Sequence, residues 1–102
     1  PITFQLSVAF SVFVIGLYIL MAKRNILKII LGIEMMLSGC NIAIISIGGM
    51  LAQNGVDPLA QSVVIISIAV GAGIAALAVA LAALAYSRFG TLDITKLSEL
   101  KG

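Results

Sequence analysis

The sequence has no histidine, no tryptophan and only one cysteine, Cys40. One cysteine cannot form the intramolecular disulfides of a small secreted scaffold, and without histidine it cannot complete a zinc site. Charged residues make up 10% of the chain, against about 25% in a typical soluble domain, so they are too few to cover a water-facing surface. The formal net charge of +2 is too small to indicate a nucleic-acid-binding protein.

The sequence also lacks the residue patterns of a catalytic or cofactor-binding site. No nucleophile is paired with a base, and there is no phosphate-binding loop, haem ligand set or iron–sulfur cysteine pattern. We therefore predict no catalytic residue, no metal site and no cofactor.

Hydrophobic residues dominate what is present, at 62% of the chain, and they gather in three apolar stretches, 2–22, 29–51 and 62–87. Each exceeds the roughly 20 residues that a helix needs to cross a bilayer. Backbone polar groups in lipid must be satisfied within the segment, which favours helix even where Val and Ile are frequent. The sequence predicts an all-α membrane protein with three transmembrane helices.

We expect one three-helix membrane domain over residues 1–102, with helices at about 2–22, 26–51 and 62–87 and a tail at 88–102. The first stretch is not expected to be a cleavable signal, because no basic residue precedes it and Lys23-Arg24 follows it. In the tail, Asp93 is a plausible start for a short surface helix.

The positions of Lys and Arg along the chain predict its orientation in the membrane. Lys23, Arg24 and Lys28 lie at the first connection, whereas the 52–61 connection has neither Lys nor Arg. The positive-inside rule then places the first connection and the tail, with Arg88, Lys96 and Lys101, in the cytoplasm and the N-terminus outside. We expect a multi-pass protein of a prokaryotic cell membrane.

Glu34 is the one charged residue inside the three apolar stretches. If the second helix starts near Ile26, Glu34 lies roughly 12 Å along it, close to the bilayer centre. An acid there costs a few kcal/mol to insert, so it generally faces protein or water and is a candidate for function. The alternative is a neutral carboxylic acid that only holds helices together by hydrogen bonds.

Ser38 and Asn41 follow Glu34 by four and seven residues, so the three side chains share one face of a helix. An apolar surrounding disfavours a carboxylate anion, which suits a buried acid to accepting and releasing a proton. The hydroxyl and the amide would orient it. We predict a proton relay of Glu34, Ser38 and Asn41, with ordinary interhelical packing as the alternative for Ser38 and Asn41.

The third helix carries small residues at spacings of three and four, which lets another helix approach closely. This face is predicted to pack against a partner subunit or against the second helix. Its members are Ala69, Gly73, Ala76, Ala80 and Ala83.

The order of the helices, Lys23-Arg24-Asn25-Ile26-Leu27 at the first connection, and Gly32-Ile33-Glu34 followed by Asn41 together resemble the small K (4L) subunit of complex I. In that family the acid of helix two belongs to a chain of buried charged groups that couples proton translocation to electron transfer. The resemblance implies this role for Glu34 alone. Family members usually have a second acid in helix three, where this sequence has Ala72.

The 57–61 segment, Asp57-Pro58-Leu59-Ala60-Gln61, looks like the DPLxQ motif loop of the C subunit of Mrp-type sodium/proton antiporters. The segment from Tyr86 to Asp93 is similar to subunits of archaeal membrane-bound hydrogenase and sulfane-sulfur reductase complexes. These resemblances imply that the chain's partners are the lipid bilayer and other membrane subunits of a hetero-oligomeric complex, and no nucleic acid. They imply H⁺, Na⁺ or both as the transported ion.

Two functions follow as hypotheses. The first is a non-catalytic subunit of a complex I-like or Mrp-type ion-translocating respiratory complex, in which Glu34 takes part in proton or Na⁺/H⁺ translocation. The second is a structural linker with no direct role in ion conduction. Replacing Glu34 by Gln separates them.

Overall fold

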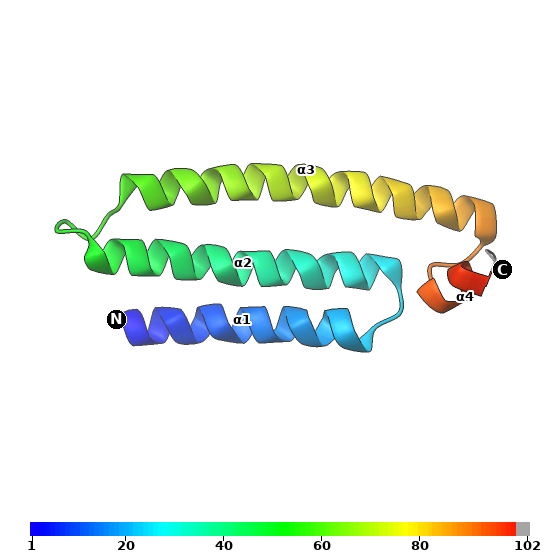
Figure 1. Ribbon diagram of the computed structural model, residues 1–102, viewed down its shortest axis with the longest axis horizontal. Helices are drawn as coiled ribbons and strands as arrows, with labels where there is room; N and C mark the ends of the chain where they lie inside the picture. Colours follow the sequence, from blue (N-terminus) through cyan, green and yellow to red (C-terminus); the bar gives the residue numbers. More distant parts are fainter. Residues whose placement is uncertain (100–102) are drawn as a thin grey trace.

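The chain forms three long helices and one short one, as the computed structural model of residues 1–99 shows (Figure 1). Lys101 lies outside the described residues. The helices, in chain order, are α1 (Ile2–Ala22), α2 (Ile26–Leu51), α3 (Pro58–Phe89) and α4 (Ile94–Glu99).

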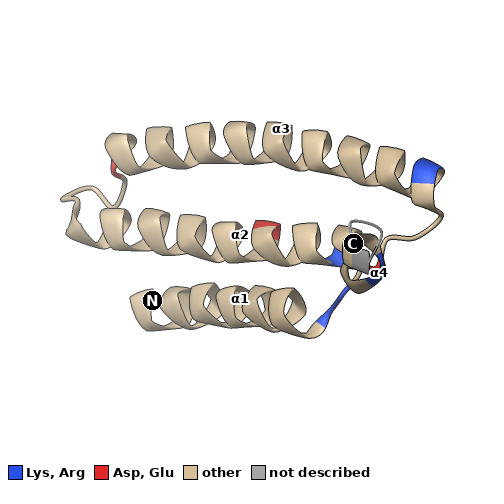
Figure 2. Ribbon diagram, turned by 45° about the vertical axis from the view of Figure 1, so that its right-hand side comes forward, with Lys and Arg blue, Asp and Glu red and all other residues tan. Residues whose placement is uncertain are grey.

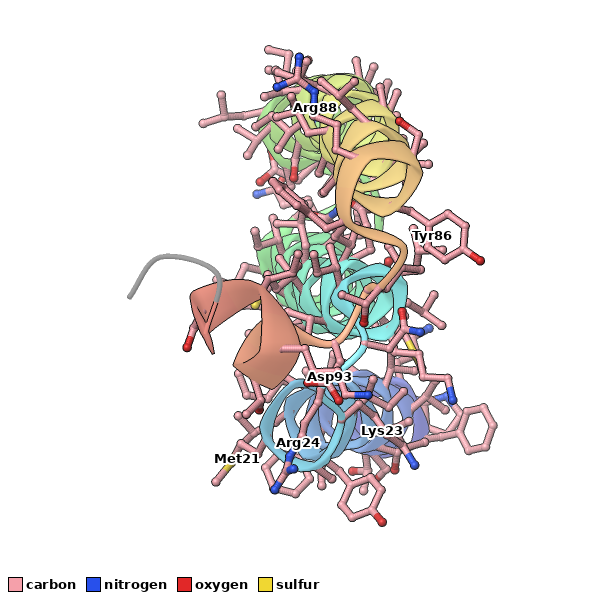
Figure 3. All side chains as sticks on the ribbon, turned by 90° about the vertical axis from the view of Figure 1, so that its right-hand side faces the viewer. Met21, Lys23, Arg24, Tyr86, Arg88 and Asp93 are labelled. Atoms are coloured by element: carbon pink, nitrogen blue, oxygen red, sulfur yellow. The ribbon has the colours of Figure 1, made fainter. Side chains whose placement is uncertain are left out.

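The long helices lie side by side in a single layer, with α2 between α1 and α3 (Figures 1 and 3). The molecule measures 57 × 23 × 17 Å, and its thinnest dimension is less than two diameters of a helix with its side chains, each about 10–12 Å. In such a layer only α2 has neighbours on two sides. Large apolar side chains are consequently exposed along all three long helices.

This exposure fits a lipid environment. All three long helices are long and apolar enough to cross a membrane. With 32 residues, α3 is about 48 Å long, so it extends beyond the roughly 30 Å hydrocarbon layer. The predicted fold class, an all-α protein with three membrane-spanning helices, is confirmed.

The third helix is longer than the expected 62–87. It starts earlier because Asp57 caps it: Leu59 N donates to Asp57 Oδ1 over 3.2 Å, and Pro58 occupies a first-turn position that needs no donor. It ends later because Gly90, at φ 72°, adopts the left-handed conformation that closes a helix. The expectation that Pro58, Leu59 and Gln61 form a loop is wrong, since they lie in the first turn of α3.

The tail folds back onto the connection between α1 and α2. Ile26 N donates to Leu92 O over 3.0 Å, and Ile94 N donates to Arg24 O over 2.9 Å. Figure 3 shows Asp93 close to Arg24 and Lys23 at this end of the bundle. Thr95 N donates to Asp93 Oδ1 over 2.8 Å, so Asp93 caps the short helix α4. These contacts hold the charged segments together.

Glycines bring α1 and α2 into backbone contact. A Cβ atom added at Gly32 would lie 2.8 Å from Gly16 O, and one added at Gly39 would lie 2.8 Å from Ala9 O. Ala9 and Gly16 are seven residues apart, as are Gly32 and Gly39, so the two close approaches lie two helical turns apart along an antiparallel pair. This packing fixes which face of α2 is turned away from α1.

Candidate functional site: the carboxyl group between α2 and α3

Glu34 lies on the face of α2 that is turned toward α3. Its side chain is half-buried, and its nearest counterpart on α3 is Gly71. A Cβ atom added at Gly71 would lie 3.2 Å from Glu34 Oε1 and 2.8 Å from Leu37 Cδ2. The absence of a side chain at Gly71 therefore leaves the space that the carboxyl group occupies.

The acid lies well inside the membrane-spanning part of the chain. In Figure 2 the acidic segment of α2 is away from both ends of the helix, and the Lys and Arg segments lie toward the end near α4. Lys23, Arg24, Lys28, Arg88 and Lys96 are all exposed there. Which side of the membrane this end faces remains a prediction.

A small cavity lies next to the carboxyl group, on the side nearer to α4. Its volume is about 80 Å³. Apart from Glu34, it is lined by apolar residues, namely Ile30, Ile33, Ile74, Ala75 and Ala78. The side chains around this part of the acid offer it no hydrogen-bonding group.

The other two predicted relay residues lie on the opposite side of Glu34 along α2. Ser38 Oγ donates to the backbone oxygen of Glu34 over 2.9 Å, so its proton is directed to the helix backbone rather than to the carboxyl group. Asn41 is buried, with 8% of its surface exposed. Both residues line a second cavity of about 240 Å³, which Ile42, Ile45, Val64 and Ile68 complete.

The predicted packing face of α3 does not contact α2. Ala69, Gly73, Ala76, Ala80 and Ala83 are all exposed, and a Cβ atom added at Gly73 would meet nothing within 4 Å. A different stripe faces α2, with Ala60, Val64, Gly71 and Ala82 buried. Of the two predicted partners for the small-residue face, helix two is wrong, and a partner subunit stays a prediction.

The 57–61 segment, which resembles the DPLxQ motif, lies at the end of the α2–α3 interface that is farther from α4. A Cβ atom added at Gly48 would lie 2.8 Å from the Cβ of Ala60 and 3.2 Å from Asp57 Oδ2. Asp57 is half-buried, whereas Pro58, Leu59 and Gln61 are exposed. In this segment, therefore, Asp57 and Ala60 are the residues packed toward α2.

Sequence reasoning missed several residues that shape the site. Gly71 makes room for Glu34, and Gly16, Gly32 and Gly39 hold α1 against α2. Ser67, half-buried, lies between Val64 and Gly71 on the α2-facing stripe of α3. Small residues seven apart in both of the first two helices were the available signal for the α1–α2 contact.

No group of three or more potential metal ligands occurs among residues 1–99. Cys40 and Ala72 are both exposed. Position 72, where the resembling family usually has its second acid, is therefore directed away from the α2-facing stripe.

Comparison with known proteins gives consistent matches over nearly the whole chain. The family described as NADH-ubiquinone/plastoquinone oxidoreductase chain 4L matches residues 4–102. NADH-quinone oxidoreductase subunit K of Pseudomonas syringae pv. tomato is 35% identical over 102 residues, covering 100% of this chain and 96% of that protein. The subunit of the same name from Pseudomonas fluorescens is also 35% identical, with the same coverage.

A solved structure is similar as well. It is the membrane-bound sulfane sulfur reductase (MBS), described as an archaeal respiratory membrane complex. One of its chains is 37% identical to this one and superposes with a TM-score of 0.78, covering 89% of this chain and 94% of that chain. At this identity the similarity concerns sequence as well as fold.

Proposed function

Because this chain belongs to the NADH-ubiquinone/plastoquinone oxidoreductase chain 4L family, we propose that Glu34 is a protonatable station in ion translocation by the complex that contains it. The resemblance to the K (4L) subunit and to a subunit of an archaeal sulfane-sulfur reductase complex is confirmed. The chain is a small multi-pass membrane subunit of a complex I-like respiratory complex and has other membrane subunits as partners. The Mrp-type part of the resemblance stays a prediction.

One observation carries the proposal. The carboxyl group of Glu34 lies between α2 and α3, opposite Gly71, and not on an outer face of the layer. An acid within a membrane protein is costly to insert and generally faces protein or water when it serves a function. In this position it can take up and release a proton without being in contact with lipid on all sides.

The transported ion is part of the proposal. A carboxylic acid binds and releases H⁺ directly, so we assign H⁺ to Glu34, with Na⁺ exchange taking place elsewhere in the complex if it occurs. The energy source is a redox reaction of other subunits, as in the respiratory complexes to which the relatives belong. A second acid would also have to come from a neighbouring subunit, because Ala72 has no titratable group.

The test is Glu34→Gln in the intact complex, reconstituted in proteoliposomes. Glutamine keeps the size of the side chain but cannot be deprotonated, so proton transport should fall by about 100-fold, the lower end of what a positioned proton-transfer group contributes. Asp93→Asn is the matched control, because it makes the same chemical change at the charged end and keeps an oxygen that can accept from Thr95 N. Transport is measured with a pH-sensitive dye, and assembly by the subunit composition of the purified complex.

A structural linker is the second candidate, and the exposed small-residue face of α3 favours it. In that case Glu34→Gln would leave transport unchanged. Gly73→Leu and Ala76→Leu would instead prevent assembly, since a bulky side chain there keeps another helix from approaching. Unchanged transport in an assembled Glu34→Gln complex would end the relay proposal.

A further inference from the structure

A groove lies between α2 and α3 at the end of the bundle near α4, away from the site of Glu34. Its volume is about 260 Å³, and it opens to the outside of the helix layer. Except for one phenolic hydroxyl, its lining consists of hydrocarbon side chains. The lining residues are Leu27, Val79, Ala83, Tyr86 and Leu92. A groove of this composition favours a hydrocarbon chain over a polar solute.

The tail of the chain forms one side of this groove. The backbone oxygen of Leu92 accepts from Ile26 N over 3.0 Å, and Ile94 N donates to Arg24 O over 2.9 Å. The side chain of Leu92 is half-buried. Two backbone hydrogen bonds thus hold Leu92 next to the first turn of α2, where it lines the groove with Leu27.

The groove runs along α3 from the charged end of the bundle into the membrane-spanning part. Val79 and Tyr86 are seven residues apart, which is about 10 Å along a helix. Arg88 follows Tyr86 by two residues and lies in the last turn of α3. Tyrosine is frequent where the headgroups of a membrane meet the hydrocarbon, because its ring is apolar and its hydroxyl is polar. An acyl chain of a lipid runs in the same direction, with its headgroup at the charged end.

A cationic side chain lies on the side of the layer to which the groove opens. Ala82 is buried against α2, and Ala83 follows it by about 100° around α3. On α2, Leu27 lines the groove, and Lys28 follows it by the same angle. Because α2 and α3 are antiparallel, both rotations lead to the same side of the layer. Figure 3 shows the Tyr86 hydroxyl directed outward on this side, opposite to α4.

The whole end of the bundle has an excess of positive charge. Among residues 1–98 it has one carboxylate, Asp93, whose Oδ1 already accepts from Thr95 N. The Lys and Arg side chains at this end are all exposed, namely Lys23, Arg24, Lys28, Arg88 and Lys96. Clusters of Lys and Arg next to membrane-spanning helices attract the headgroups of anionic lipids.

We propose that this groove binds an acyl chain of an anionic phospholipid, whose phosphate lies at Lys28 and Tyr86. The ammonium group of Lys28 and the hydroxyl of Tyr86 both donate, and phosphate oxygens accept. The lipid supplies hydrocarbon for the groove and negative charge for the cations, a combination that matches both features of this end. The proposal is independent of the role of Glu34. A helix of another subunit is the competing occupant, because Ala83 also belongs to the small-residue face of α3.

Photolabelling of the intact complex in lipid nanodiscs tests the proposal. One reagent is phosphatidylglycerol with a diazirine in an acyl chain, and the other is phosphatidylcholine with the same chain. Labelled peptides are identified by mass spectrometry. We expect phosphatidylglycerol to label residues 79–86 about fivefold more, since one Lys or Arg near the membrane surface strengthens binding of acidic lipids by about this factor. Equal labelling by the two lipids would overturn the proposal.

Two substitutions of the same kind test the part played by Lys28. Lys28→Gln should lower labelling of residues 79–86 by phosphatidylglycerol about fivefold, to the level of phosphatidylcholine. Lys96→Gln makes the same change in α4, on the opposite side of the layer, and should leave the labelling nearly unchanged. An equal loss in both variants would show a general effect of surface charge and would overturn the assignment of the phosphate to Lys28.

Filling the groove separates a lipid from a helix of another subunit. Ala83→Leu puts a bulky side chain into the groove and should lower labelling at least tenfold in an assembled complex. Ala76→Leu makes the same change seven residues earlier on the same face, outside the groove, and should leave labelling unchanged. A helix packed along this face would be displaced by either change. If both variants prevent assembly and residues 79–86 of the unaltered complex are not labelled, a helix of another subunit occupies the groove and the proposal is wrong. If both prevent assembly but the unaltered complex is labelled, the loss in Lys28→Gln decides for the lipid.

Discussion

The two interfaces of α2 differ in the kind of atoms that meet there, backbone atoms toward α1 and side-chain atoms toward α3. Toward α1, glycines place backbone against backbone: an added Cβ at Gly16 would lie 2.6 Å from Gly32 O and 2.7 Å from Met36 N. Toward α3, the atoms nearest to a Cβ added at Gly71 belong to the side chains of Leu37 and Glu34. The first interface brings two helices together, whereas the second leaves room for a functional group.

This difference assigns separate tasks to the two sides of one helix. Small residues let the backbones of α1 and α2 approach closely, so these two helices are tightly packed. The side facing α3 has cavities on both sides of Glu34, and only one of them is lined by Ser38 and Asn41. In a layer one helix thick, the close α1–α2 contact positions α2, while the α3 side leaves the space that the Glu34 side chain occupies.

The largest effect is expected from filling the α1–α2 contact. Gly32→Ala adds a Cβ that would lie 2.8 Å from Gly16 O and 3.0 Å from Leu20 N, so the helices must separate. We expect a loss of about 3 kcal/mol, at the upper end of overpacking effects, and little assembled complex. The measurements are the amount of complex in membranes and its melting temperature in mild detergent.

Gly73→Ala is the matched control for this change, because the added Cβ meets nothing within 4 Å in this chain. Alanine is the better helix former by about 1 kcal/mol in water, so stability should not fall. An equal loss in both variants would mean that another subunit packs on α3 as closely as α1 packs on α2. The contrast between the two interfaces would then be a property of the isolated chain alone.

Sequence reasoning predicted the helices well because membrane insertion depends on the length and hydrophobicity of a segment, which can be read locally. Glu34 could be found for the same reason, since one charge in an apolar span stands out. The two ends of α3 were harder to predict from the sequence. Asp57 and Gly90 act through capping geometry, which extended the helix beyond its most apolar part at both ends.

The faces of α3 could not be predicted in the same way. Small residues occur almost all around this helix, so spacing alone selected Ala69, Gly73 and Ala76 as readily as the stripe that contains Gly71. Which stripe meets α2 depends on the register between two helices, a non-local property. The same limit applies to Ser38, whose hydroxyl donates to Glu34 O instead of the carboxyl group.

An intermediate effect is expected from filling the space opposite the acid. Gly71→Ala adds a methyl group that would lie 2.8 Å from Leu37 Cδ2 and 3.2 Å from Glu34 Oε1. Because both neighbours are side chains, they can move, so we expect a destabilisation of about 1 kcal/mol, at the low end of overpacking, and an assembled complex. Proton transport should fall by about tenfold, because the acid must shift by a few tenths of an ångström, and a misplacement of about 1 Å can already cost about 100-fold. The measurement is dye-monitored transport in proteoliposomes.

The double variant Gly71→Ala, Leu37→Ala tests the cause. Removing the Leu37 side chain eliminates the closest contact of the new methyl group, so transport should recover relative to Gly71→Ala. Leu37→Ala alone measures the cost of the truncation itself. If the double variant transports no better than Gly71→Ala, crowding through Leu37 is not the reason for the loss, and the direct contact of the methyl group with Glu34 Oε1 is left as the cause.

The smallest effect is expected at the start of α3, where replacing Asp57 removes a hydrogen bond rather than a packing contact. Asp57→Ala removes the oxygen that accepts from Leu59 N at the start of α3, which should lower stability by about 1 kcal/mol. Asp57→Asn keeps an acceptor and should lose little, so the melting temperatures of the two variants separate capping from charge. Because the cap fixes where α3 begins and not how it packs at Gly71, proton transport should change far less than in Gly71→Ala. A transport loss in Asp57→Asn as large as that in Gly71→Ala would show instead that the charge of Asp57 matters to conduction, and the α3 side would then have a second functional acid.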